Sequence, residues 1–391
     1  MSRYRWIELK AVLALKTRTI FERIANEWLV EVPTYVPGPL AKYIAALSGL
    51  KQDQIVKLSS NENPLGPPPL AVKSVLDSTS ILSYYPDSQA RELRAHISTW
   101  LGGGFNPNNI VVGSGSSETM SLIVRAFSKE GDHVVCVDPS FLLHREIASI
   151  EGRKPIIAKL TPEAFELKPD DVMNVLSNKT KIIFIARPNN PTGRLVPLKV
   201  VRQISENCPD AVVVCDEAYV EFADDYPEAS AASLVDEYGN ILVTRTFSKV
   251  FGLCDLRVGY TVGPESAIKF VSKIKPKWNV GMLAQNACSA ALRDIKHFEK
   301  TLATVKGGRE YLKKELLKLG FGVVPNPQGN FLMVKVSVKG FTSAQFFHEL
   351  ATKGFSIRGG TEDLGNEYIR ISVGTQAQNR TLIEAIQEVA R

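Results

Sequence analysis

AVVVCDEAYVEF, residues 211–222, opens with an unbroken apolar run and then changes abruptly to two carboxylates. Similar short, β-branched runs recur at NIVVG (109–113), HVVCVD (133–138), KIIFIA (181–186), ILVTRT (241–246) and LRVGYTV (256–262). Because these runs are apolar throughout rather than alternating, they predict strands that are covered on both faces. Helix-length segments such as 116–130 separate most of them. This order predicts an α/β fold with a mostly parallel sheet.

The pattern changes after about residue 280, where charged helical segments alternate with a few strand-like runs. We therefore expect four parts in the chain. They are an N-terminal extension (1–30), a segment that packs on the smaller domain (31–60), a large ligand-binding domain (61–280) and a small α+β domain (281–391). The extension is basic and predicts an amphipathic helix. An extra helix, or a start codon placed too early, is favoured over a transit peptide, and a secretory signal is excluded.

The composition excludes several classes of protein. The chain has 391 residues, 44% of them hydrophobic, and no apolar run approaches the roughly 20 residues that cross a bilayer. The net charge of +6 comes without a dense basic run, which disfavours nucleic acid as a partner and would suit a small anionic ligand. The five cysteines form no CxxC pair, which indicates reduced thiols in the cytoplasm. Cysteines and histidines are scattered, so no metal site is expected.

Two glycine-containing segments follow predicted strands, where open α/β sheets bind ligands. In VVGSGSSE (111–118), glycines and serines open a helix, and free N–H groups at a helix start can bind phosphate. A common helix cap would have the same composition. In IARPNNPTGR (185–194), two asparagines lie in a tight turn, which is either only a turn or a source of fixed hydrogen-bond donors.

Two further segments carry charge. Asp216 ends an apolar strand and needs a partner, which could be a helix N-terminus, a structural ion pair or a cationic ligand atom, with Tyr219 near the same ligand. TRTFSKVFGLCDLRVGY (244–260) places Lys249 among hydroxyl groups and near Arg257. A partly desolvated lysine is a nucleophilic amine that can form a Schiff base, and the hydroxyls and the arginine suit an anion. A ligand with a phosphate and a carbonyl explains the whole segment, and pyridoxal 5′-phosphate would use all four segments.

With these motifs the sequence resembles the fold-type I pyridoxal-phosphate-dependent aminotransferases, and among them the histidinol-phosphate aminotransferase group. The resemblance runs from about residue 32 to the C-terminus. Its motifs are LSSNENPLGPPP (58–69), YYPDSQARELR (84–94), GSGSSE (113–118), PNNPTG (188–193), DEAYVEF (216–222), TFSKVFGLCDLRVGY (246–260) and YIRISVGT (368–375).

The resemblance implies a role for each matching residue. Lys249 would form the Schiff base and act as the general base and acid of the proton shift. Asp216 would pair with the pyridine nitrogen, Phe141 would stack on the ring, and Asn190 and Tyr219 would hold the ring oxygen. The residues implied for the cofactor phosphate are Ser116, Ser117, Thr246, Ser248, Arg257 and, from the neighbouring subunit of a homodimer, Tyr85.

For the substrate, the resemblance implies Arg370 for its anionic end and Arg358 and Tyr35 for its phosphate. Two arginines suit a dianionic phosphate through charge-assisted bonds. Arg358 could equally be a solvated loop residue. The implied reaction converts L-histidinol phosphate and 2-oxoglutarate to imidazole acetol phosphate and glutamate, in histidine synthesis.

Alternatives remain on the same scaffold. They are a threonine-phosphate decarboxylase of cobalamin synthesis and a broad aromatic or aspartate aminotransferase. Non-catalytic regulators of this fold typically carry a winged-helix DNA-binding domain ahead of it. This alternative is disfavoured, because the roughly thirty residues that precede the resemblance are too few for such a domain. The chain departs from the family pattern at Pro39, His144, Arg187 and Asp255. We expect none of these to touch the cofactor set, and His144 and Arg187 are the two departures that could alter substrate choice.

Overall fold

A seven-stranded sheet forms the centre of the computed structural model, which describes residues 19–32, 41–361 and 364–391. The strand order is β2-β8-β7-β6-β5-β3-β4, and β8 is antiparallel to both of its neighbours while the other pairs are parallel. The predicted α/β fold with a mostly parallel sheet is confirmed. The strands are β2 (Ile110–Ser114), β3 (His133–Asp138), β4 (Lys154–Lys159), β5 (Thr180–Ala186), β6 (Val212–Asp216), β7 (Ile241–Thr246) and β8 (Val258–Val262). Only β4 was not among the predicted strands of this sheet.

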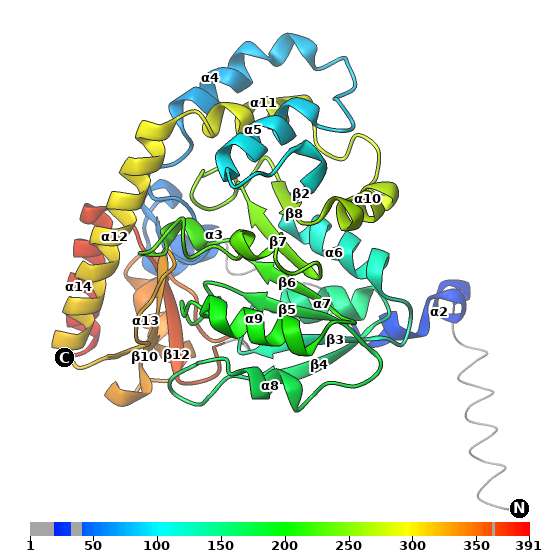
Figure 1. The fold of residues 1–391 in the computed structure, drawn as a ribbon. Helices are drawn as coiled ribbons and strands as arrows, with labels where there is room; N and C mark the ends of the chain where they lie inside the picture. Colours follow the sequence, from blue (N-terminus) through cyan, green and yellow to red (C-terminus); the bar gives the residue numbers. More distant parts are fainter. Residues whose placement is uncertain (1–18, 33–40, 362–363) are drawn as a thin grey trace, which may run out of the picture.

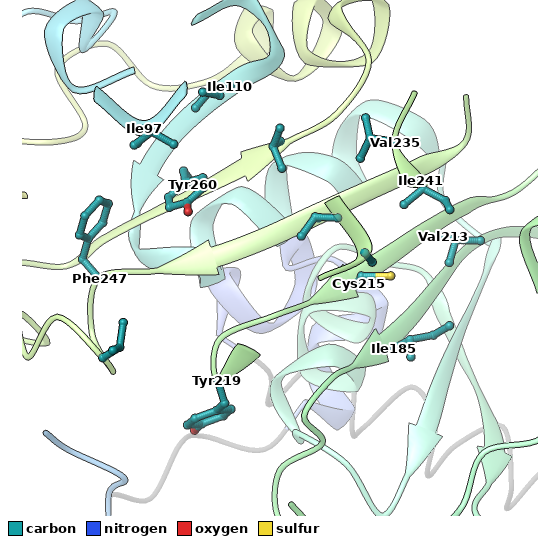
Figure 2. Packing of buried hydrophobic residues seen from close by; sticks show 14 of the residues in the cluster. Ile97, Ile110, Ile185, Val213, Cys215, Tyr219, Val235, Ile241, Phe247 and Tyr260 are labelled. Carbon is teal, nitrogen blue, oxygen red and sulfur yellow. The ribbon is translucent and has the colours of Figure 1, made fainter. Parts of the chain in front are cut away.

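Helices cover both faces of the sheet, which explains why its strands are apolar throughout (Figure 1). One face packs against α6 (Gly115–Phe127), α7 (Leu143–Ile150) and α10 (Glu265–Ile274). The other packs against α5 (Arg91–Leu101), α8 (Pro169–Met173), α9 (Leu198–Asn207), α11 (Met282–Ala291) and α4 (Pro69–Asp77). The apolar residues between the sheet and this second set of helices form the first hydrophobic core, and Figure 2 shows the part where Ile185, Cys215 and Tyr260 come from β5, β6 and β8.

A second hydrophobic core belongs to the C-terminal part of the chain. Strands β12 (Tyr368–Ser372), β10 (Phe331–Lys335) and β9 (Gly322–Val323) form an antiparallel sheet, and α13 (Ser343–Thr352) and α14 (Gln376–Val389) pack around it. The long helix α12 (Ile295–Lys318) joins the two cores, because its Val305 lies in the first and its Leu312 in the second.

The segment before the large sheet packs on this second core. Helix α3 (Ala41–Ser48) lies against α13, and β1 (Val56–Lys57) pairs in parallel with β11 (Phe355–Ser356). Of the predicted N-terminal helix, the structure describes α2 (Ile20–Ile24) and the 3₁₀ helix η1 (Glu27–Glu31); residues 1–18 lie outside the described residues. Trp28 anchors this piece, since its indole N–H donates to the Ile150 carbonyl at 3.1 Å.

The remaining described elements are short 3₁₀ helices. They are η2 (Gln52–Gln54), η3 (Thr79–Ile81), η4 (Pro107–Asn109), η5 (Val220–Phe222), η6 (Ala231–Leu234) and η7 (Ser337–Lys339). Within the described ranges, no helix has the length and apolar character needed to cross a membrane.

Candidate active site

A cavity of about 580 Å³ opens where the strands β5, β6 and β7 end. The last residues of these strands, Ala186, Asp216 and Thr246, lie in its wall. The carboxyl ends of parallel strands are where open α/β sheets bind ligands. Twelve of the fourteen site residues predicted from the sequence line this one cavity: Ser116, Ser117, Phe141, Asn190, Asp216, Tyr219, Thr246, Ser248, Lys249, Arg257, Arg358 and Arg370. Segments far apart in the chain therefore converge on a single site.

One end of the cavity is built to receive an anion. Helix α6 begins there without a side-chain cap on its first turn, so its free N–H groups and Ser116 and Ser117 face the space. Arg257 brings a cation to the same place. Gly115 has a φ of 77°, and a Cβ on it would lie 2.7 Å from Nη2 of Arg257. The glycine thus lets the guanidinium lie against the helix start, and this arrangement fits a phosphate group.

The buried carboxylate Asp216 has a specific partner in His144. Oδ2 of Asp216 lies 3.0 Å from Nε2 of His144, and Oδ1 accepts the Ala218 amide at 3.2 Å. The His144 ring stacks on Phe184 at a centroid distance of 4.7 Å and meets Phe141 edge-on. An ionised carboxylate only accepts hydrogen bonds, so Nε2 of His144 is the donor in this contact when Asp216 is ionised. The side chain of Asp216 is held at the cavity wall by contacts on both oxygens.

Lys249 lies in the wall of the same cavity. Its Nζ donates to the Ser60 carbonyl at 3.0 Å and lies 5.5 Å from the centroid of the Tyr219 ring. The Tyr219 hydroxyl accepts from Nδ2 of Asn61 at 3.1 Å. The lysine amine is held by one carbonyl and one ring face, and among the described residues no carboxylate makes a salt bridge to it. It is therefore available to react with a carbonyl group.

The two asparagines of the PNNPTG turn, Asn189 and Asn190, have different contacts. Asn189 stabilises the turn, since its Nδ2 donates to Thr192 Oγ1 and to the Pro139 carbonyl, each at 2.9 Å. Asn190 instead lines the cavity, and its Oδ1 accepts from Nη1 of Arg370 at 2.5 Å. Only the second asparagine can contact a ligand.

Two arginines lie together on the side formed by the C-terminal part of the chain. Arg358 and Arg370 are paired by two backbone hydrogen bonds of 3.0 and 2.8 Å, so their side chains start from adjacent positions. Arg370 is buried and donates from Nη2 to the Ser59 carbonyl at 2.5 Å. Two adjacent guanidinium groups in one wall suit a second anionic group, distinct from the one at α6.

Two predicted site residues do not join this cluster. Tyr35 lies outside the described residues. Tyr85 is not in the cavity wall: its side chain is 78% exposed and stacks on Trp278 with a centroid distance of 4.6 Å.

Several residues of the site were not predicted from the sequence. Ser59, Ser60, Asn61 and Glu62 line the cavity, as do Leu142, Leu143 and Glu146 at the start of α7. The first group lies in the motif LSSNENPLGPPP, to which no role was given, and the positive φ of Asn61 (53°) is a local signal of an unusual turn. The second group follows Phe141 directly and could have been found from that position.

The expectation for two departures was partly wrong. His144 contacts Asp216 and is therefore not separate from the cofactor set. Neither His144 nor Arg187 lies in the cavity wall, so neither is placed to choose a substrate by direct contact. Asp255 is exposed, and Pro39 lies outside the described residues.

Comparison with known families places this geometry in context. Residues 53–386 match the family described as aminotransferase class I and II. The histidinol-phosphate aminotransferase of Methanosarcina mazei is 38% identical over 362 residues, which cover 92% of this chain and 95% of that protein. The enzyme of the same name from Methanosphaera stadtmanae is 33% identical over 378 residues, covering 96% of this chain and 99% of that protein.

Solved structures share the fold at lower identity. The histidinol-phosphate aminotransferase of Sinorhizobium meliloti, in complex with pyridoxal-5′-phosphate, superposes with a TM-score of 0.82 at 23% identity, covering 96% of this chain and 99% of that one. An aspartate aminotransferase double mutant of Thermus thermophilus gives 0.81 at 20% identity, covering 93% of this chain and 99% of that one.

Proposed function

This chain belongs to the class I and II aminotransferase family, and on that premise we propose that it transfers the amino group of L-histidinol phosphate to 2-oxoglutarate. The products are imidazole acetol phosphate and glutamate, and the cofactor is pyridoxal 5′-phosphate. The observation that carries the substrate is a second pair of cationic side chains, Arg358 with Arg370, in the wall of the cavity that also holds the start of α6. The relatives named histidinol-phosphate aminotransferase support the same assignment.

Pyridoxal phosphate, when bound, supplies an aldehyde that takes up amines and a ring that withdraws electrons. The start of α6, with Ser116, Ser117 and Arg257, would hold its phosphate, with Thr246 and Ser248 lining the same part of the wall. Phe141 would lie against the ring.

The remaining groups set the chemistry. Asp216, held by His144, would keep the ring nitrogen protonated, and Asn190 and Tyr219 would hold the ring oxygen. Lys249 would bind the aldehyde when no substrate is present. The Nζ of Lys249 is also the group that would move a proton at the carbon bearing the substrate amine.

The substrate phosphate would be bound by Arg358 and Arg370. Asn190 and the Ser59 carbonyl already hold the guanidinium of Arg370, so little side-chain entropy is lost when the anion binds. Tyr35 is proposed for the same phosphate. The carboxylate of glutamate or 2-oxoglutarate would use Arg370 in the second half of the reaction. The alternatives, a threonine-phosphate decarboxylase and a broad aromatic or aspartate aminotransferase, have no comparable support among the relatives.

We also propose a homodimer with shared sites, in which Tyr85 reaches the cofactor phosphate of the partner. Trp278, which stacks on Tyr85, is 47% exposed, and large apolar side chains close to Tyr85 in the chain are exposed as well. These are Leu76, Leu82 and Tyr84, with exposures of 66%, 70% and 74%. Exposed apolar side chains in one segment support a protein contact. The buried, unpaired thiols support a cytoplasmic enzyme, and the modest net charge supports small molecules rather than nucleic acid or a membrane as partners.

The test is a half-reaction on purified protein loaded with pyridoxal phosphate. Histidinol phosphate, added without a keto acid, should abolish the visible absorption of the bound cofactor, and 2-oxoglutarate should restore it. If histidinol phosphate leaves the absorption unchanged while threonine phosphate releases carbon dioxide, the cofactor assignment holds and the proposed substrate is wrong.

A further inference from the structure

Three buried charged side chains lie behind the cavity. Arg187, Glu217 and Arg245 are 1%, 0% and 2% exposed, and we call them the charged row. Oε1 of Glu217 accepts from Nη1 of Arg187 at 2.6 Å, and Oε2 accepts from Nη2 of Arg245 at 3.1 Å. The carboxylate is therefore shared between two guanidinium groups in the interior of the protein.

The strand register explains why these three residues meet. Ile185 of β5 pairs with Cys215 of β6, and Cys215 pairs with Val243 of β7. Side chains on a strand alternate between the two faces, so residues two positions further along point to the same face. Those residues are Arg187, Glu217 and Arg245. The charged row thus continues an apolar row of the first core at the end where the three strands stop.

The residues next to the charged row form the cavity wall. Ala186 and Pro188 flank Arg187, Asp216 and Ala218 flank Glu217, and Thr246 follows Arg245. Each member of the row is therefore one peptide bond from a residue that faces the ligand.

Main-chain amides and the guanidinium of Arg187 together hold the main chain around these positions. The Arg187 amide donates to the Asp216 carbonyl and the Glu217 amide to the Thr244 carbonyl, each at 2.8 Å. The guanidinium of Arg187 further donates to the Val196 carbonyl at 2.9 and 3.1 Å and to the Ala229 carbonyl at 2.7 Å. Arg187 alone thus ties the ends of two strands to two loops.

Charges in such a position are not explained by stability, because well-packed apolar side chains would often serve as well or better. What they add is a set of directional contacts that permit one arrangement of the three strand ends. We propose that Arg187 is a positioning residue for the cofactor. Its bond to Glu217 fixes the adjacent residue Asp216, and its own place in the chain, directly before PNNPTG, fixes that turn. The inference rests on the proposed pairing of Asp216 with the ring nitrogen.

The test compares two variants with the wild type as purified, cofactor-loaded enzymes. Arg187→Met removes every contact of the guanidinium, and Arg187→Lys keeps the charge beside Glu217. We measure the dissociation constant of pyridoxal phosphate and the midpoint of the pH titration of its visible absorption. Arg187→Met should raise the dissociation constant about tenfold and move the midpoint by about half a unit or more. Arg187→Lys should recover a large part of both.

A matched control separates positioning from general destabilisation. Arg309 is also fully buried (0% exposed), but it donates to the Phe222 and Gly329 carbonyls and to Asp224, and none of these contacts is to the charged row. Arg309→Met should lower the melting temperature and leave the titration midpoint in place. Equal midpoint shifts in the Arg187 and Arg309 variants, or no shift in Arg187→Met, would overturn the inference. Neither measurement uses a substrate, whereas a wild type that binds no pyridoxal phosphate would refute the proposed function itself.

Discussion

His144 Nε2 lies 3.0 Å from Asp216 Oδ2, and both side chains are almost completely buried. A carboxylate in such a place must be paired, because an isolated buried charge is costly. The imidazole provides one partner, and its stacking on Phe184 fixes its plane. The side chain of Asp216 is therefore already oriented at the cavity wall.

His144→Phe should lower turnover while leaving the fold intact. The phenyl ring retains the stacking on Phe184 but leaves Asp216 without its buried donor. Losing a hydrogen bond to a charged group costs about 1.5 to 3 kcal/mol, which corresponds to a loss of about 10- to 100-fold in kcat. The check is steady-state kinetics with circular dichroism. His133→Phe is the control, since His133 lies at the start of β3 and contacts Ser177. A kcat equal to that of wild type in His144→Phe would contradict the role.

Arg358→Ala should impair phosphorylated substrates selectively. If Arg358 binds the substrate phosphate, its removal should reduce kcat/KM for histidinol phosphate about 10- to 100-fold, because charge-assisted bonds contribute about 1.5 to 3 kcal/mol. An unphosphorylated aromatic amino acid should lose much less. The two substrates are compared on the same preparation. Equal losses on both would remove the argument for a phosphorylated substrate.

Lys249→Ala and Tyr85→Ala should complement each other when mixed. Lys249→Ala should be inactive alone, because it lacks the amine that binds the aldehyde and moves the proton. If Tyr85 serves the partner's site, a hybrid dimer contains one site with both residues intact. Random mixing makes half of the dimers hybrid, and each hybrid has one intact site of its two. The activity should therefore approach about one quarter of the wild-type activity, in addition to the residual activity of Tyr85→Ala. The measurement needs subunit exchange, for example by co-expression. If the hybrid dimers gain no activity, Tyr85 either serves the site of its own subunit or takes no part in catalysis.

The unfolding free energy should depend on pH through Glu221. Burial raises the pKa of this carboxyl to about 7, against the opposing effect of Arg245, whose Nη1 lies 3.7 Å away. The folded state then keeps a proton that the unfolded chain releases above its ordinary pKa of 4.5, so stability falls as the pH rises from about 4.5 to about 7. The neighbouring Tyr226 and Tyr260 stay protonated in this range, because burial raises the pKa of both.

Glu221→Gln removes this titration and nearly preserves the shape. From pH 5 to pH 8, the unfolding free energy of the wild type should fall by about 2 to 3 kcal/mol more than that of the variant. Urea unfolding at several pH values gives the comparison. Parallel pH profiles for the two proteins would show that Glu221 is ionised in the folded state over the whole range.

Local patterns were sufficient for the elements of the large sheet and for most of the cavity. Apolar runs predicted every strand of the large sheet except β4, whose sequence KPIIAK has a lysine at each end and a proline near its start, and is therefore a weak strand signal. The four chemistry-bearing segments all meet in the cavity because each follows a strand or opens a helix at the same edge of the sheet.

Partners between segments could not be predicted in the same way. The pairing of His144 with Asp216, the stacking of Tyr85 on Trp278 and the side-by-side placement of Arg358 and Arg370 join residues that are distant in the chain or related only through strand register. Arg187 shows the difference most clearly, because its position before PNNPTG suggested a role in substrate choice, whereas its guanidinium is buried on the far face of the strand ends.

The sequence by itself determined which segments become strands and which residue types reach the carboxyl edge of the sheet, because hydrophobic period and turn chemistry act over a few residues. Only the tertiary structure decided which side chain of each segment faces the ligand and which faces the interior. The alternation of a strand places Asp216 and Glu217 on opposite faces. The packing of α7 gives the first a histidine, and the register of three strands gives the second two arginines.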